Sequence, residues 1–79
     1  MGQDRLPVLK ARQIILVLER LGFKHRKLKA TSHRRYFHSN GRKTNIPIHP
    51  GQDIGRGLLR KILKDIEISP EEFRELLQK

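Results

Sequence analysis

A histidine beside two arginines is the part of this sequence best suited to chemistry. His33, Arg34 and Arg35 lie in the run from Thr31 to Ser39, which starts with two hydroxyl side chains and then alternates like a β-strand. Histidine side chains titrate near pH ~6.5, so neutral imidazole, the form that accepts a proton, is available at pH 7. Guanidinium groups offer planar sets of N–H donors that match phosphate oxygens. A base beside such donors indicates chemistry on a phosphodiester.

The charge of the chain favours a polyanionic partner. The formal net charge is +10, from 18 Lys and Arg against 8 Asp and Glu. From Arg20 to Gln52, both included, there is no acidic residue, whereas nine Lys or Arg and all four His fall there. Such a one-signed stretch attracts nucleic acid, because contacts with phosphates release counterions. The alternative is a solvated basic face that only keeps the protein in solution.

Length and composition limit the remaining possibilities. A chain of 79 residues predicts a single domain over residues 1–79 that buries about 60–65% of its unfolded surface, so we expect no deep cleft. Without cysteine it has neither disulfides nor thiolate metal sites, which is compatible with a reducing compartment. No apolar run approaches the ~18 residues of a membrane span, and the first residues lack a signal-peptide pattern. We expect a cytoplasmic protein without a membrane segment.

Apolar periodicity predicts the first helix over residues 10–21. The residues expected to face the core recur at helical spacing: Ala11, Ile14, Ile15, Leu18 and Leu21. Gly22 follows them as the residue that terminates the helix. Leu16 and Val17 widen the apolar surface beyond this stripe. These two residues are either half-buried or available to contact a partner protein.

Three strands are expected over residues 23–30, 33–38 and 43–49. Asn40-Gly41 between two alternating runs predicts a hairpin, with residues 39–42 as its turn. Pro47 cannot donate to a ladder, so the third strand should lie at an edge or end there. On a regular strand His33 and Phe37 share one face. With Phe37 taken as a core residue, His33 either escapes the core at the beginning of the strand, which we favour, or is re-aimed by a bulge.

Two further helices complete the predicted fold. A helix over residues 55–66 has one apolar stripe, made of Leu58, Leu59, Ile62, Leu63 and Ile66. Ser69-Pro70-Glu71-Glu72 is a capping box with proline at the first helical position, which predicts a last helix over residues 70–78. The order α-β-β-β-α-α predicts a small α+β domain, with helices packed on one face of a three-stranded antiparallel sheet.

Several of these features together resemble the HicA toxin family over roughly residues 6–77. They are Leu21-Gly22-Phe23, Ser32-His33, the Asn40-Gly41 hairpin, Ile46-Pro47-Ile48-His49, and the segment from Gly57 to Lys64. The resemblance implies a double-stranded-RNA-binding-domain-like fold. It also implies a type II toxin–antitoxin toxin that cleaves mRNA independently of the ribosome, is neutralised by a HicB-like antitoxin, and uses His33 as the catalytic residue. One position departs from the family, which usually has glycine where this chain has Thr31.

Cleavage of RNA without a metal requires a base for the 2′-hydroxyl and positive charge for the transition state. We expect His33 to be the base, and we expect the RNA to be held by Ser32, Arg34, Arg35, Lys43 and Lys29. No metal or other cofactor is expected, because the histidines have no recognised ligand spacing. The free protein is expected to be a monomer. The alternative is a non-catalytic RNA-binding module, in which His33 only contacts RNA.

Overall fold

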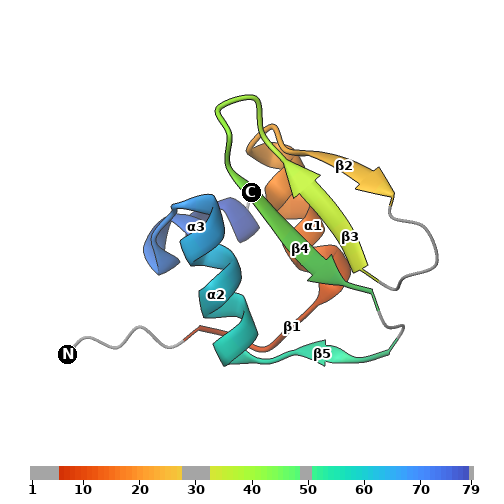
Figure 1. The fold of residues 1–79 in the computed structure, drawn as a ribbon. Helices are drawn as coiled ribbons and strands as arrows, with labels where there is room; N and C mark the ends of the chain where they lie inside the picture. Colours follow the sequence, from red (N-terminus) through yellow and green to blue (C-terminus); the bar gives the residue numbers. More distant parts are fainter. Residues whose placement is uncertain (1–5, 28–32, 49–50, 79) are drawn as a thin grey trace.

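The chain forms a small α+β domain in which the three predicted helices and three predicted strands follow one another in the expected order, with two further short strands (Figure 1). This computed structural model describes residues 6–27, 33–48 and 51–78. Its elements, in chain order, are β1 (Leu9–Lys10), α1 (Ala11–Arg20), β2 (Lys24–Lys27), β3 (His33–Phe37), β4 (Lys43–Pro47), β5 (Asp53–Ile54), α2 (Arg56–Ile66) and α3 (Pro70–Leu77). The double-stranded-RNA-binding-domain-like arrangement of α1, β2, β3, β4 and α2 is therefore confirmed, with α3 following it.

The main sheet is antiparallel and has β3 at its centre. Its strand order is β2-β3-β4, with His33 opposite Pro47 and Phe37 opposite Lys43 across the β3–β4 pair. The predicted hairpin turn joins these strands, and Gly41 at its tip has a φ of 98°, which glycine adopts without strain. The edge position predicted for the strand with Pro47 is confirmed, and Pro47 is also its last residue.

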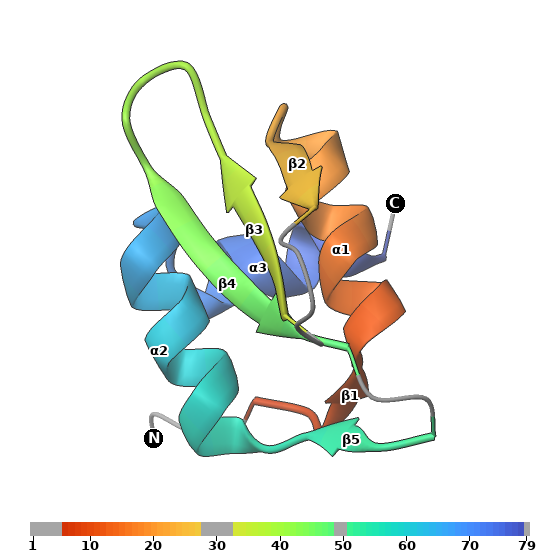
Figure 2. The same ribbon diagram turned by 45° about the vertical axis from the view of Figure 1, so that its right-hand side comes forward.

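The helices lie on one face of this sheet. Figure 1 shows α1 behind β3 and β4, and Figure 2 shows α3 behind the same strands and α2 beside β4. The buried stripe of α1 is Ile14, Val17 and Leu18, each at 0% exposure, so Val17 belongs to the core rather than to a partner-facing surface. The spacing i, i+3, i+4 from Ile14 explains this. Leu16 points away from the stripe and is 44% exposed.

A second, two-stranded sheet was not predicted from the sequence. β1 pairs with β5, joining Leu9 to Ile54 and Lys10 to Asp53, where a loop and the first residue of a helix were expected. Leu9 and Ile54 are buried, and the Lys10 Nζ lies 2.7 Å from the Asp53 carboxylate. Strands of two residues are too short to show periodicity, which is why the sequence pattern missed them. The pair fixes the start of α1 beside the chain that leads into α2.

The helix ends follow the local signals. Gly22 has a φ of 94° and terminates α1. Ser69 precedes α3 as its N-cap, and its Oγ accepts a hydrogen bond from the Glu72 backbone N–H at 3.0 Å.

β2 ends at Lys27 in the described part of the chain, and residues 28–30 of the strand expected over 23–30 lie outside it. Among the described residues, no helix has the length and apolar character needed to cross a membrane.

Candidate functional site

The candidate site is the sheet face that the helices leave uncovered, called the open face below. Cross-strand partners in an antiparallel sheet project to the same side. The register therefore groups residues from all three strands on this face: Lys24 and Arg26 from β2, His33, Arg35 and Phe37 from β3, and Lys43, Asn45 and Pro47 from β4. All of them are exposed except the half-buried Pro47. The candidate base thus lies on a surface whose other side chains include cations from each strand.

The aromatic side chain that enters the core from β3 is Tyr36, not Phe37. Tyr36 is 1% exposed, whereas Phe37 is 41% exposed. The premise that Phe37 faces the core was therefore wrong. His33 does lie at the beginning of β3, as we favoured from the sequence, but it needs neither this position nor a bulge to escape burial, because its whole face of β3 is open to solvent. The alternation of the strand was predicted correctly, but the buried side was assigned to the wrong residues.

The charge of the open face is positive. Arg26 and Arg35 are cross-strand partners, and Lys24 and Lys43 are the partners of Phe37 on its two sides. The side chains that form this face include no carboxylate. Arg35 Nε lies 3.4 Å from the amide oxygen of Asn45, its partner on β4, which orients the guanidinium along the face. This surface can attract and hold an extended polyanion.

The predicted RNA-binding residues are only partly brought together. Arg35 and Lys43 share the open face with His33, whereas Arg34 is half-buried and pairs with Ile46 on the other side of the sheet. Ser32 and Lys29 lie outside the described residues. Lys24 and Arg26 were not predicted. Only the pairing register of β2 with β3 brings these two side chains to the site, and short-range sequence patterns do not reveal that register.

The remaining described histidines serve the fold or lie off the open face. The His38 ring packs edge-on against Phe23, with ring centroids 5.1 Å apart. Its Nδ1 accepts a hydrogen bond from the Asn40 backbone N–H at 3.1 Å, so its Nε2 donates to the Leu21 carbonyl at 3.2 Å. His25 lies beside Tyr36 on the helix side of the sheet, and His49 is outside the described residues. In residues 6–27, 33–48 and 51–78, no His, Asp or Glu side chains form a group able to hold a metal ion.

Arg42 holds the hairpin in place rather than joining the open face. Its backbone N–H and Nε both donate to the Asn40 side-chain oxygen at 3.1 Å. Its guanidinium lies over the Phe23 ring, 5.1 Å from the centroid, and Nη1 donates to the Ile66 carbonyl at the end of α2. The turn after β3 is thereby fixed to the core, which keeps the β3–β4 register, and with it the open face, in place.

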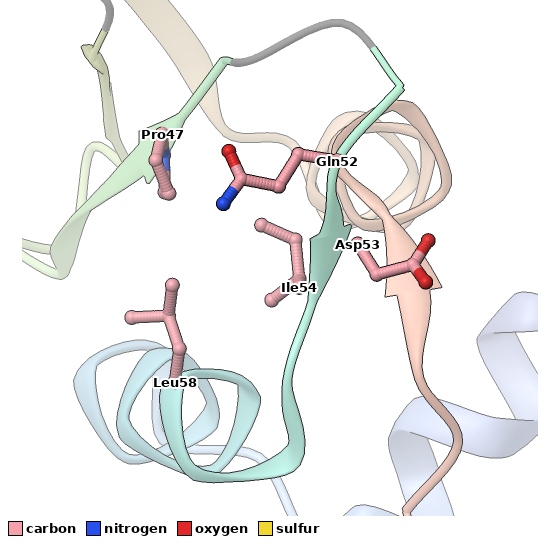
Figure 3. A pocket seen from close by; sticks show the side chains of 5 residues that line it. All are labelled: Pro47, Gln52, Asp53, Ile54 and Leu58. Carbon is pink, nitrogen blue, oxygen red and sulfur yellow. The ribbon is translucent and has the colours of Figure 1, made fainter.

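A hollow of about 220 Å³ lies at the end of β4, between Pro47, β5 and the start of α2. Figure 3 shows Pro47, Ile54 and Leu58 as its apolar walls and the Gln52 amide extending over it, while the Asp53 carboxylate turns away. Leu58 was expected in the core stripe of its helix but is 37% exposed, because the neighbouring Leu59 occupies the buried position. Pro47 connects the hollow to the open face, since it is the cross-strand partner of His33.

Taken together, the fold and the open face define a small α+β domain suited to an extended polyanion. The family model described as the HicA toxin of bacterial toxin–antitoxin systems matches residues 11–68. The chain therefore belongs to the HicA toxin family, the toxin half of a toxin–antitoxin pair. A search of curated proteins found no match. The matched range contains every residue of the open face and ends before α3.

Proposed function

We propose that this protein is an endoribonuclease that cleaves mRNA without a metal ion, with His33 as the general base. The observation that carries the proposal is the position of His33. It is an exposed imidazole on a sheet face that also presents Arg26, Arg35 and Lys43. Membership of a toxin family supports an activity harmful to the cell, and cleavage of messenger RNA is such an activity.

The proposed reaction is a transesterification in which the nucleophile is a 2′-oxygen of the RNA itself. His33 removes the proton from a 2′-hydroxyl, the 2′-oxygen forms a bond to the adjacent phosphorus, and the bond from phosphorus to the 5′-oxygen breaks. The products are a 2′,3′-cyclic phosphate and a 5′-hydroxyl, whose oxygen takes a proton from water. Arg35 is two residues from His33 on the same face, about 7 Å along the strand, and its guanidinium stabilises the negative charge of the transition state.

The hollow lined by Pro47, the cross-strand partner of His33, offers space for part of a nucleotide bound at the open face. The hollow beside Pro47 has apolar walls, and the Gln52 amide at its edge can donate and accept hydrogen bonds. A ribose or base in this hollow would leave the rest of the strand to run over Pro47 onto the open face that carries His33. A non-catalytic RNA-binding module would use the same cations, but it would have no need for a general base among them.

Incubation of the purified protein with a defined RNA in excess EDTA tests this function. The expected result is internal cleavage to fragments with 2′,3′-cyclic phosphate ends, because no step requires a divalent ion. Denaturing gels with end-labelled RNA and mass spectrometry of the fragments provide the measurement. Binding without cleavage, with or without added Mg²⁺ or Mn²⁺, would favour the RNA-binding module. Cleavage that returns only with a divalent ion would contradict a metal-free mechanism.

The antitoxin that the family implies is proposed to act by covering the open face. A partner with acidic side chains would complement Lys24, Arg26, Arg35 and Lys43, and charge complementarity would accelerate the encounter. Leu16 offers exposed apolar surface on α1, whereas Val17 does not, because it is fully buried.

In a complex with its cognate antitoxin, His33 should be protected from diethyl pyrocarbonate. Mass spectrometry of the modified protein, free and bound, measures this protection for each histidine. The half-buried His38 provides an internal reference, since its two ring nitrogens are already engaged in the free protein. Equal modification of His33 in both states would show that inhibition does not mask the site.

A further inference from the structure

We propose that the open face binds single-stranded RNA and that Phe37 holds one nucleobase by stacking against it. This inference rests on the proposed function, because it assigns the substrate class of the same face. It adds a binding residue that the catalytic step does not require.

Phe37 is exposed and does not contribute to packing of the core. Tyr36, its neighbour, already fills the interior at 1% exposure, and Phe37 projects to solvent at 41%. Among the large apolar residues that are exposed in the described part of the chain, Phe37 is the one aromatic; the others are Val8, Leu16 and Leu58. A phenyl ring on a solvent-facing sheet offers a flat surface on which a planar base can lie.

The neighbours of Phe37 match the rest of a nucleotide. Lys24 and Lys43 are its cross-strand partners on β2 and β4, so a cation stands on each side of the ring, with Cβ atoms about 5 Å from that of Phe37. An aromatic ring between two cations can bind a base and the phosphates that flank it at the same time. Proteins that bind single strands combine basic grooves and aromatic platforms in this way.

A solvent-facing ring such as that of Phe37 can stack only on an unpaired base of RNA. A base inside a duplex is stacked on its neighbours and cannot reach a protein ring, whereas a base in a loop or an open strand can. Phe37 is four residues from His33 on the same face of β3, about 13 Å along the strand. A single strand that follows β3 would therefore have one base on Phe37 and a phosphodiester further along at His33.

RNA binding by the His33→Ala protein, which leaves the RNA intact, tests the inference. The probe is a short unstructured RNA with a fluorescent end label, titrated at several salt concentrations and read by anisotropy. Replacing Phe37 by leucine should weaken binding about tenfold without changing the slope of log affinity against log salt, because the stacking contact carries no charge. Phe37→Trp should restore the affinity. A duplex of the same length should bind equally well to all three proteins.

Two controls separate stacking from other causes. Leu16→Ala removes apolar surface of similar exposure from α1 and should leave RNA affinity unchanged. The double substitution Arg35→Gln and Lys43→Gln should flatten the salt slope, because it removes cations that displace counterions. Melting temperatures of all variants establish that each is folded.

Each outcome has a distinct meaning. If Phe37→Leu binds the single strand as tightly as its parent, or if it weakens only the complex with the antitoxin, stacking is overturned while the proposed ribonuclease remains. If the parent binds no RNA at any salt concentration, the proposed function fails together with the inference. A tenfold loss that appears equally with the duplex would also contradict stacking on an unpaired base.

Discussion

Replacing His33 by alanine is expected to lower the rate of RNA cleavage by at least about 100-fold, because general-base catalysis typically contributes that much or more. The side chain is exposed on the open face, and the core does not depend on it. Surface substitutions of this kind usually change stability by less than about 0.5 kcal/mol. Initial cleavage rates of a fluorescent RNA, measured beside the melting temperature, therefore separate a catalytic role from a structural one.

His25→Ala is the matched control for this prediction. His25 is also an exposed histidine on the main sheet, but it lies beside Tyr36 on the side opposite the open face. Its removal should leave the cleavage rate within about threefold of wild type, because it touches neither the reacting groups nor their positioning cations. Wild-type rates for His33→Ala would exclude this imidazole from the mechanism. A parallel loss in both variants would point to a shared effect on the sheet.

The elements that the sequence predicted well are those whose signals are local. Helix periodicity, Gly22 after α1, Ser69 before α3 and the Asn40-Gly41 turn each act within a few residues, and each has its expected place in the structure. The buried side of β3 was assigned wrongly. Tyr36 and Phe37 are both large aromatics one residue apart, so alternation alone cannot tell which of them faces the helices.

Which residues form the open face depends on how strands that are distant in the sequence pair with one another. Arg35 and Lys43 could be placed near His33 from the hairpin, because a tight turn sets the register of its two strands. Lys24 and Arg26 could not, since β2 has low β-propensity and is joined to β3 by the longer segment that contains residues 28–32. The Pro47 hollow likewise depends on β5 and α2, which approach the end of β4 only in the folded chain.

Replacing Phe73 by alanine should cost about 3–5 kcal/mol of unfolding free energy, as large truncations in a packed core do. Phe73 comes from α3, beyond the range that the family model matches, yet its side chain is 0% exposed and belongs to the same core as Tyr36. α3 packs against α1, and Arg20 Nη1 donates to the Leu76 carbonyl between them. Because a small domain has only about 5–15 kcal/mol of stability in total, this substitution should leave a large unfolded fraction.

Urea unfolding followed by circular dichroism measures the loss, with Glu75→Ala as the control from the exposed side of the same helix. That control should shift the midpoint little, since its side chain is solvated and helix propensity favours alanine. Catalysis by Phe73→Ala should fall only in proportion to the folded fraction, because α3 lies behind the sheet and contributes no residue to the open face. An unchanged midpoint would contradict a core role for this helix. A folded but inactive Phe73→Ala would instead require α3 to act on the open face through the sheet.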